Sequence, residues 1–501
     1  MAGPYINQAH IQGLVEAKKK QIANRAMQIQ NLVRLQEAEI SELAALQLTV
    51  SPIGKLPTEL LIKVFYLVVP PELFSDQGSD NTDQIVDGAH RVSQVCHHWR
   101  EIAHGAPQLW VDGFRFSVSE RPSRLELEQT TAWLERSHPL PITIYFHCTA
   151  GGNLDPGVGF KETELFRILL STTRRWRHVI WDIPYLCPLG DLHPGDFEGL
   201  EQFTIENRDL RPPTKSLDVF LSATRLREVG IRTHGADQPD IIEVFHFPWK
   251  QLTSLTLEDG LSFGACRDIM LQCTSMRSMK IRSCSWDALE VSPAPPVVVL
   301  PFLNTLELHV DGLVATALGH LFPSLALPAL KSLNLSFNDP LHHTVMWDTA
   351  LFSEFQIRSP SVEKIVLTAQ ETAVAVENLL ALVRHSPAVT DLTINVFGID
   401  DVFVHGLQVK ENDPHPLAPR LVTLALGHPV DASSDELDSA LEGMIRSRWK
   451  PTGDSRVFDA NVPRIASLKT VVFADRRNRV SQEFSSGLVA LLEQGFDLIF
   501  K

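Results

Sequence analysis

A recurrent apolar pattern dominates the chain between residues 200 and 426. Each copy has apolar residues at its first, fourth and sixth positions, and successive copies start 24 to 32 residues apart. The regular copies start at Leu200, Leu226, Leu252, Met276, Leu303, Leu330, Val362, Val389 and Leu421, and looser copies start at Trp176 and Leu468. Apolar residues at alternate positions predict a short strand with one buried face.

Helical patterns fill the intervals between these predicted strands. They are clearest at residues 164–176, 312–321, 376–385 and 436–449. A strand and a helix in each interval predict a parallel sheet whose strands follow the order of the chain. The arrangement resembles leucine-rich repeats of the strand-plus-helix kind, although the asparagine that often follows the strand in that family is mostly missing. We expect this solenoid to span 140–501, with a first strand at 142–146 and a closing helix at 486–494.

The first fifty residues predict one long helix. Between Asn7 and Leu48 there is no proline and a single glycine, and good helix formers dominate. Two heptad seams run along it, made by Val15, Ile22, Ile29, Gln36 and Leu43 and by Lys19, Ala26, Val33, Ile40 and Gln47. A coiled coil is one interpretation, and a single helix that packs on its own domain or frays in solvent is the other. Because polar residues interrupt both seams, a tight homodimer is not expected.

Two short amphipathic helices are expected between residues 52 and 110. Pro57 suits the first helical turn because its ring fixes φ and it has no N–H group. One helical face is made by Leu60, Leu61, Val64, Phe65 and Val68. The second helix has its apolar face at Val92, Val95, Cys96, Trp99, Ile102 and Ala103. So few residues make a small core, and such a module usually needs a partner surface.

The order of these residues resembles the F-box, which docks on the Skp-type adaptor of SCF ubiquitin ligases. The resemblance is carried by Leu56-Pro57, Val95-Cys96, Trp99-Arg100 and Leu109-Trp110. It implies that the adaptor is bound by Ile53, Leu56, Pro57, Leu60, Leu61, Val64, Phe65, Val95, Cys96 and Trp99. An ordinary helical hairpin with its own private core is the alternative.

A polar run at 70–88 departs from the compact F-box pattern. Its composition predicts a loop inserted between the two helices. Long surface insertions cost little loop-closure entropy, so we expect the module to tolerate it. Three parts are therefore expected: a helix at 1–50, an F-box-like module at 51–112 and the solenoid.

Composition and charge narrow the range of functions. The chain has 501 residues, of which 44% are hydrophobic and 21% charged, as in soluble globular proteins with two or three domains. A formal net charge of −15 argues against nucleic acid or an anionic membrane as the partner. There is no membrane-spanning apolar stretch and no secretory signal pattern, so we expect a soluble protein of the cytoplasm or nucleus.

No catalytic or cofactor-binding motif stands out. The sequence lacks a phosphate-binding loop with its lysine and the paired ligands of a zinc site. The spacing of Cys266, Cys273 and Cys284 fits no common zinc pattern, and we expect these to be buried thiols in a reducing compartment. Cys96 is expected in a helix core rather than as a nucleophile. The expectation is a non-enzymatic protein with no catalytic residue, metal or cofactor.

One residue in each predicted strand, between the fourth and sixth positions, should point away from the core. These residues are Thr204, Gly230, Thr256, Lys280, Glu307, Asn334, Val366, Thr393 and Ala425. Most are polar or small, as a solvated face requires. We expect substrate to bind in the middle of this row, at Thr256, Lys280, Glu307 and Asn334.

The complete order of long helix, F-box-like module and solenoid resembles F-box proteins with leucine-rich repeats, especially a large fungal group with an N-terminal coiled-coil-like helix. That resemblance implies an α/β protein acting as a substrate receptor. It would bind a Skp-type adaptor, and through it a cullin–RING ligase, together with an unknown protein substrate. Two other functions stay open: a repeat scaffold outside the ubiquitin pathway, and a receptor that senses a small molecule on its repeat face.

Overall fold

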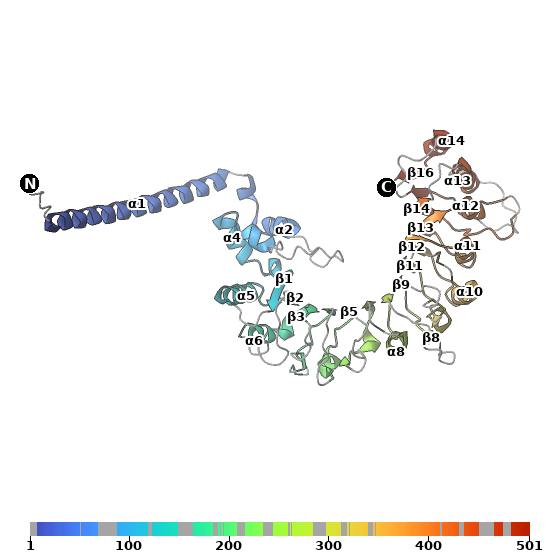
Figure 1. Cartoon of the computed structure of the whole chain (residues 1–501), viewed down its shortest axis with the longest axis horizontal. Helices are drawn as coiled ribbons and strands as arrows, with labels where there is room; N and C mark the ends of the chain where they lie inside the picture. The colour runs from blue at the N-terminus through green and yellow to red at the C-terminus, as the bar shows by residue number, and fades with distance from the viewer. Residues whose placement is uncertain are drawn as a thin grey trace, which may run out of the picture. The chain divides into compact units, whose positions relative to one another are not determined.

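The computed structural model of the chain divides into two compact units, Met1–Leu109 (unit 1) and Trp110–Lys501 (unit 2) (Figure 1). The structure describes residues 8–50, 52–68, 88–118, 123–148, 164–183, 189–190, 192–193, 195–207, 216–233, 244–258, 261, 263–283, 297–311, 318–319, 321–338, 344–345, 347–410, 413–429, 435–449, 465–473 and 482–500. The predicted insertion at 70–88 therefore lies almost wholly outside the described residues. Within the described ranges, no helix is both long and apolar enough to cross a membrane.

Unit 1 is helical throughout its described part. The predicted long helix is present as α1 (Gln8–Val50), and the 3₁₀ helix η1 (Pro52–Lys55) follows it. The F-box-like module then consists of α2 (Thr58–Val68), α3 (Gly88–Ser93), α4 (His97–His104) and η3 (Pro107–Leu109). Pro57 lies immediately before α2, and its carbonyl accepts hydrogen bonds from the amides of Leu60 and Leu61 at 3.0 and 3.1 Å. Proline thus starts this helix, as its fixed φ predicted.

The second helix of the module is broken in two, whereas the apolar spacing had predicted one. Cys96 is the N-cap of α4, with an extended backbone, and its Sγ accepts a hydrogen bond from the Trp99 amide at 3.4 Å. Arg100 Nε donates to the carbonyl of Ser93, at the end of α3, at 3.0 Å. These side chains satisfy backbone groups that the break leaves without a helical partner. The spacing of apolar residues contains no sign of such polar contacts, so it could not predict the break.

The core of the module is small and aromatic at its centre. Leu61 and Phe65 face inward from α2, and the rings of Phe65 and Trp99 have centroids 4.7 Å apart. Further buried apolar side chains come from α3 and α4, namely Ala89, Val92, Ile102 and Ala103. Packing between α2 and the broken second helix therefore holds the module together.

Unit 2 is built on one parallel sheet, which has fourteen strands within the described residues, in the order of the chain. The strands are β1 (Phe114–Val118), β2 (Ile142–Cys148), β3 (Trp176–Asp182), β4 (Gln202–Asn207), β5 (Glu228–Thr233), β6 (Ser254–Glu258), β7 (Ser278–Ser283), β9 (Thr305–Asp311), β11 (Ser332–Asn338), β12 (Lys364–Ala373), β13 (Asp391–Ile399), β14 (Thr423–Pro429), β15 (Thr470–Phe473) and β16 (Asp497–Phe500). The short strands β8 (Val298–Val299) and β10 (Leu325–Ala326) pair only with each other. The predicted parallel order is thus confirmed.

Helices lie along one side of this sheet (Figure 1). They are α5 (Arg124–Arg136), α6 (Glu164–Leu170), α8 (Phe263–Gln272), α10 (Thr349–Arg358), α11 (Val376–Arg384), α12 (Asp401–Leu407), α13 (Asp435–Arg448) and α14 (Gln482–Glu493). Other intervals hold the 3₁₀ helices η4 (Thr173–Arg175), η6 (Asp218–Ser222), η7 (Trp249–Gln251) and η8 (Phe322–Ser324). The helices predicted at 376–385 and 436–449 are confirmed within a residue or two at each end, whereas most of 312–321 lies outside the described residues.

The helix predicted at 164–176 is shorter than expected. α6 ends at Leu170, and the hydroxyls of Ser171 and Thr172 donate to the carbonyls of Ile168 and Leu169 at 2.6 and 2.7 Å. Hydroxyls bonded to the preceding turn compete with helix continuation. The chain is then free to enter β3 at Trp176.

The apolar pattern is the core of unit 2. Leu255 and Leu257 of β6 are each 1% exposed, and they are in register with Met279 and Ile281 of β7. Just before the strands, a second set of backbone hydrogen bonds of 2.7–2.9 Å runs from repeat to repeat. It begins with the Glu201 amide donating to Arg177 and ends with the Asp497 amide donating to Lys469. Each strand is therefore already bonded to the preceding repeat at the residues just ahead of its first paired position.

Buried or half-buried arginines tie some repeats to the preceding interval. We call Arg175, Arg358 and Arg448 the arginine links. Each donates to backbone carbonyls: Arg175 to Leu134 and Leu140, Arg358 to Phe322 and Leu325, and Arg448 to Leu407, Leu417 and Ala418. Burial lowers the pKa of Arg448 to about 10. The carbonyls lie in loops, at the ends of helices or in the short strand β10, outside the fourteen-stranded sheet, and the guanidinium groups supply them with donors.

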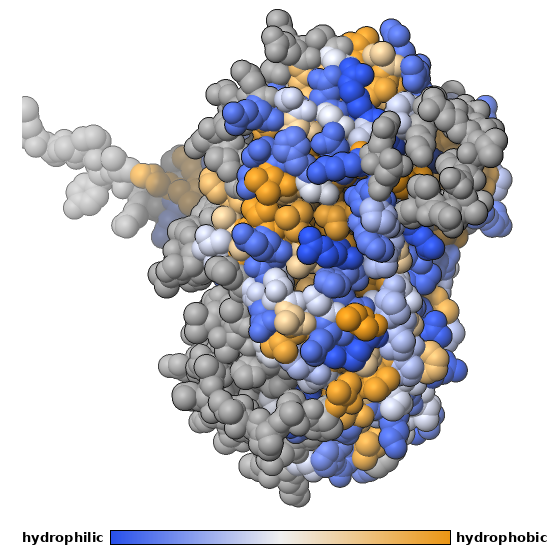
Figure 2. All heavy atoms as spheres, turned by 90° about the vertical axis from the view of Figure 1, so that its right-hand side faces the viewer, coloured by the Kyte–Doolittle hydropathy of each residue, from blue (hydrophilic) through white to orange (hydrophobic). Residues whose placement is uncertain are grey.

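The sheet extends further at both ends than expected. It begins at Phe114 in β1, not near residue 140, and β16 follows the predicted closing helix. β1 carries the repeat pattern at Val111, Phe114 and Phe116, although it was not among the predicted copies. β16 has Gly495 at the first position, and it is an edge strand in which Asp497 and Ile499 are exposed. Figure 2 shows the side of unit 2 that carries α11 to α13, where apolar side chains lie among hydrophilic ones.

Candidate protein-interaction surfaces

α2 has apolar side chains on two sides, and only one side is buried. Leu61 and Phe65 are 0% and 1% exposed. Leu60 and Val64, each one residue earlier on the helix, are 45% and 38% exposed, and Leu56 ahead of the helix is 38% exposed. An apolar strip left in solvent on a small module is typical of a protein–protein contact.

The residues predicted to bind the adaptor fall into three groups. Leu56, Pro57, Leu60, Val64 and Val95 are exposed. Ile53, Cys96 and Trp99 are half-buried. Leu61 and Phe65 are buried, which differs from the sequence-based assignment, because their side chains fill the module core. They hold the exposed strip in place from within and offer a partner no surface of their own.

The sequence-based set also left out part of the strip. Leu67, which is 83% exposed, follows Val64 by three residues and Leu60 by seven, so it continues the same side of α2. Tyr66 and Val68 are exposed as well. The helical spacing of these residues already predicts that Leu67 lies on the same side, whereas the residues that carry the F-box resemblance lie in the first half of the helix. We call Leu56, Leu60, Val64 and Leu67 the α2 strip.

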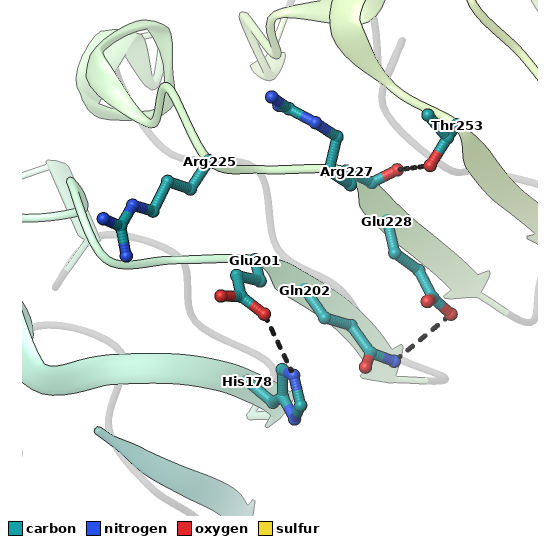
Figure 3. Close-up of a pocket in the computed structure, with 7 residues that line it drawn as sticks. All are labelled: His178, Glu201, Gln202, Arg225, Arg227, Glu228 and Thr253. Carbon is teal, nitrogen blue, oxygen red and sulfur yellow. Dashed lines mark hydrogen bonds and ion pairs between the residues drawn. The ribbon is translucent and has the colours of Figure 1, made fainter. Parts of the chain in front are cut away.

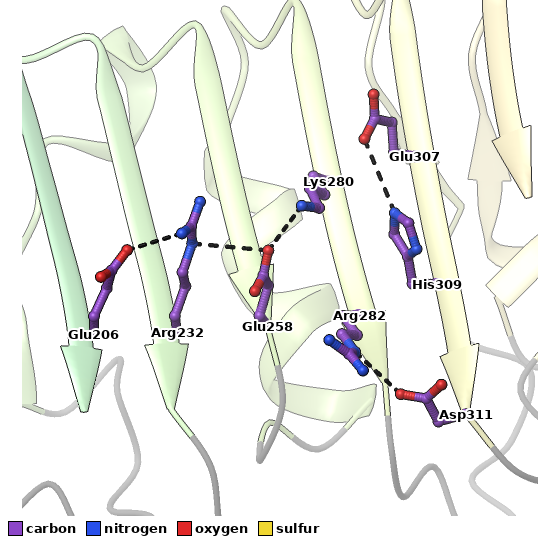
Figure 4. Close-up of polar contacts among 8 residues, drawn as sticks. All are labelled: Glu206, Arg232, Glu258, Lys280, Arg282, Glu307, His309 and Asp311. Carbon is purple, nitrogen blue, oxygen red and sulfur yellow. Dashed lines mark hydrogen bonds and ion pairs between the residues drawn. The ribbon is translucent and has the colours of Figure 1, made fainter. Parts of the chain in front are cut away.

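The face of the sheet that turns away from the buried positions carries a line of charges (Figure 4). Arg232 Nη1 lies 2.8 Å from Glu206 Oε1, and Arg232 Nε lies 3.8 Å from Glu258 Oε1. Lys280 Nζ lies 2.9 Å from the same Glu258 oxygen. The register explains this line, since it places Glu206, Arg232 and Glu258 side by side on β4, β5 and β6.

The same face continues with two more pairs on β7 and β9 (Figure 4). Arg282 Nε lies 3.0 Å from Asp311 Oδ2, and His309 Nε2 lies 4.0 Å from Glu307 Oε2. Burial, followed by the charge of Lys280, lowers the pKa of His309, so this ring is neutral at pH 7. Both signs of charge alternate over five strands, and we call these eight residues the charged belt.

The residues expected to bind substrate lie beside this belt. Thr256, Lys280, Glu307 and Asn334 occupy one continuous register row across β6, β7, β9 and β11. All four are half-buried, between neighbours that are buried. The structure therefore brings the four predicted residues together on one face, and Lys280 and Glu307 also belong to the charged belt.

An aromatic cluster marks the start of this face on β1 to β3. The Arg115 guanidinium lies 4.8 Å from the centre of the Tyr145 ring, and the Tyr145 hydroxyl donates to Asp182 Oδ2 at 3.1 Å. Burial and then the Asp182 charge raise the pKa of Tyr145. Burial also lowers the pKa of His147, whose ring stacks on Tyr145. The Tyr145 side chain thus lies between Arg115 and Asp182, and the cluster was not predicted from the sequence.

A shallow polar pocket of about 400 Å³ opens beside the N-terminal ends of β4 and β5 (Figure 3). It is lined by His178, Glu201, Gln202, Arg225, Arg227, Glu228 and Thr253. His178 Nε2 lies 4.0 Å from Glu201 Oε2, and Gln202 Nε2 donates to Glu228 Oε1 at 3.3 Å. Burial raises the pKa of Glu228 and lowers that of His178. The sequence signal for this pocket is the polar residue that precedes each strand, and it was not part of any predicted site.

Two thiols of unit 2, those of Cys266 and Cys273, are structural. Cys266 and Cys273 are buried, and burial raises the pKa of each to about 12. A thiol with so high a pKa is a poor nucleophile. Cys284 lies outside the described residues. In the ranges that the structure describes, no group of three His, Cys, Asp or Glu residues is placed to hold a metal ion.

Comparison with known proteins assigns the module. The family model described as F-box-like matches residues 53–115, which contain α2, α3 and α4. No curated protein matches the chain. The match supports an F-box protein, and with it a role in binding a Skp-type adaptor of SCF-type ligases.

Proposed function

We propose that this protein is a non-catalytic substrate receptor of an SCF-type cullin–RING ubiquitin ligase. Its F-box-like module binds the Skp-type adaptor, and the leucine-rich-repeat-like sheet of unit 2 binds the target protein. No catalytic group is needed, because tethering alone raises the effective concentration of the target's lysines near the ubiquitin-loaded enzyme.

The observation that carries this proposal is the coincidence of two features within residues 53–115. The F-box-like family match covers these residues, and the same residues expose the α2 strip over a packed core. Burying four such side chains removes a few hundred Å² of apolar surface from water, worth several kcal/mol at roughly 25 cal/mol per Å². That is enough to support a specific docking surface.

The adaptor arm is tested with Leu60→Lys/Val64→Lys. Both side chains are exposed, so unfolding should change little while copurification of the adaptor is lost. Leu221→Lys is the matched control, because Leu221 is an exposed leucine of unit 2. Full adaptor binding by the double variant would contradict the proposal. Adaptor without cullin in the wild-type complex would instead favour a scaffold outside the ubiquitin pathway.

The target arm is assigned to the row of Thr256, Lys280, Glu307 and Asn334 with the charged belt beside it. These residues are half-exposed, in one register row and of mixed charge, which suits a polar protein surface.

Charge reversal at two positions of this row tests the assignment. Lys280→Glu/Glu307→Lys should remove proteins that copurify and become ubiquitinated, with the adaptor retained. The exposed pair Lys331 and Glu363, 3.4 Å apart, gives the control swap. An unchanged set of ubiquitinated partners would place the target contact elsewhere.

A further inference from the structure

The long helix α1 carries exposed apolar side chains of its own, in addition to those of the α2 strip. Every side chain from Ile11 to Leu43 is exposed. The exposed set includes large apolar side chains, among them Val15, Ile22, Ile29, Leu32, Val33, Ile40 and Leu43. A helix with so much exposed apolar surface is an interaction element, because a monomer rarely leaves such a stripe in water.

Six of the twelve large apolar side chains that are exposed on the described part of α1 lie along one seam. In heptad notation, Val15, Ile22, Ile29 and Leu43 occupy one core position, and Ala26, Val33 and Ile40 occupy the other. Lys19 and Gln36 are the polar interruptions between them. The positions that flank the seam on one side are Lys18, Arg25, Leu32, Glu39 and Leu46.

The two halves of α1 carry opposite charge. Residues 8–30 contain Lys18, Lys19, Lys20 and Arg25 against the single acid Glu16, a net charge of +3 with histidine neutral. Residues 31–50 contain Glu37, Glu39 and Glu42 against the single base Arg34, a net charge of −2. The helix is therefore complementary in charge to a copy of itself that runs in the opposite direction.

We propose that α1 pairs with α1 of a second copy of this chain as an antiparallel coiled coil. In the alignment that we favour, Ile22 packs against Ile40 of the second copy and Ile29 against Val33 of the second copy. Arg25 then flanks Glu39 of the second copy, and symmetry forms this ion pair twice. The two Leu32 side chains meet at the middle of the pair.

The polar interruptions of the seam select this direction. A parallel pair would place Lys19 against Lys19 and Gln36 against Gln36, and its flanking positions would form no ion pair. In the antiparallel pair Lys19 lies against Leu43 and Gln36 against the small Ala26, so no like charges meet in the seam. These imperfect layers make the association reversible rather than tight.

Charge reversal with compensation tests the pairing in the full chain. Arg25→Glu and Glu39→Arg, each alone, face a like charge in the pair and should weaken dimerisation roughly tenfold. The double variant restores both ion pairs and should restore the wild-type dissociation constant in sedimentation equilibrium. Arg34→Glu is the control, because Arg34 lies outside the seam and faces no charge of the second copy. Circular dichroism verifies that each variant keeps its helix.

Zero-length carbodiimide cross-linking of a mixture of ¹⁴N- and ¹⁵N-labelled protein tests the direction. Cross-links between Lys18–Lys20 of one isotope and Glu37–Glu42 of the other are expected. Within one helix these groups are about 25 Å or more apart, and in a parallel pair they are as far apart, so neither can give this product. A monomer at all concentrations, a dimer insensitive to the Arg25 and Glu39 variants, or mixed-isotope links confined to equivalent ends would each overturn the proposal.

Discussion

Units 1 and 2 differ in how much of their apolar surface they bury. Unit 2 buries the apolar positions of each repeat between its sheet and helices, and it presents charged and polar residues on the other face of the sheet. Unit 1 buries only a few side chains around Phe65 and leaves apolar strips exposed on α1 and α2. Charge pairs are therefore prominent on the outer face of β4 to β9 in unit 2, and exposed aliphatic side chains are prominent on α1 and α2 in unit 1.

The difference follows from size. A sheet of many strands has enough neighbours to cover the apolar positions of its repeats, apart from some at the edge and in the connections. The three short helices of the F-box-like module cannot do this, because a small domain keeps much of its chain at the surface. Exposed apolar side chains in unit 1 are thus expected to be covered by other proteins, whereas the buried pattern of unit 2 serves its own stability.

The largest loss of stability is expected from Phe65→Ala in unit 1. The ring is 1% exposed and packs on Trp99, so its loss should cost about 3–5 kcal/mol of the stability of the module. Hydrogen exchange should show α2 and α4 losing protection while the strands of unit 2 keep theirs. The control Leu60→Ala, at an exposed position, should change protection little, and equal effects of the two variants would refute the division into core and strip.

In unit 2 the corresponding variant is Leu257→Ala. Leu257 is 1% exposed between neighbouring strands, and we expect a loss of about 2–5 kcal/mol in urea unfolding. Thr256→Ala, on the opposite face of the same strand, serves as the control and should cost far less. If Thr256 proved as sensitive as Leu257, the assignment of the two sheet faces would be reversed.

A smaller effect is expected from Arg448→Met, which removes one arginine link. The buried carbonyls of Leu407 and Ala418 lose a donor, and we expect a loss of about 1–3 kcal/mol. Arg446→Met, on the same helix but half exposed, is the matched control. Thermal unfolding measures both, and a loss no larger than that of the control would show that the link adds no stability.

The smallest expected effect is a dependence of stability on pH. The pKa values of His147, His178 and His309 are lowered from 6.5 in unit 2, mainly by burial, so the unfolded chain binds protons more readily than the folded one. Stability should therefore fall as the pH drops below about 6.5. Replacing all three histidines by glutamine should reduce the loss in melting temperature between pH 7.5 and 5.5, and an unaltered pH profile would exclude them as its source.

The regular strands of unit 2 could be predicted because their signal is repeated. Leu255 and Leu257 have equivalents in each copy, so chance patterns average out and the parallel order follows. β1 carries the same pattern at Val111, Phe114 and Phe116, so its signal was present in the sequence. β16 could not be found this way, because glycine stands at its first position and the strand has a neighbour on one side only. The end of α6 was missed because a hydroxyl pair, not a proline or glycine, stops the helix.

The candidate sites were predicted only in part. Spacing placed Leu60 and Phe65 on one apolar face of α2, but only packing against Trp99 decides which of them is buried. Thr256, Lys280, Glu307 and Asn334 share a row because strand register follows from the repeat itself. The links between Glu206, Arg232 and Glu258 lie one row away and depend on side-chain reach across strands, which no pattern within one repeat contains.

The serial pairing of the strands also has a mechanical consequence. Each strand of the sheet is bonded only to its immediate neighbours, and these are the next strands along the chain. A pull on one end of the sheet should detach the terminal strand first, because that strand has a bonded neighbour on one side only. With 24 to 32 residues per repeat, extension would proceed in steps on the order of 100 Å, one repeat at a time.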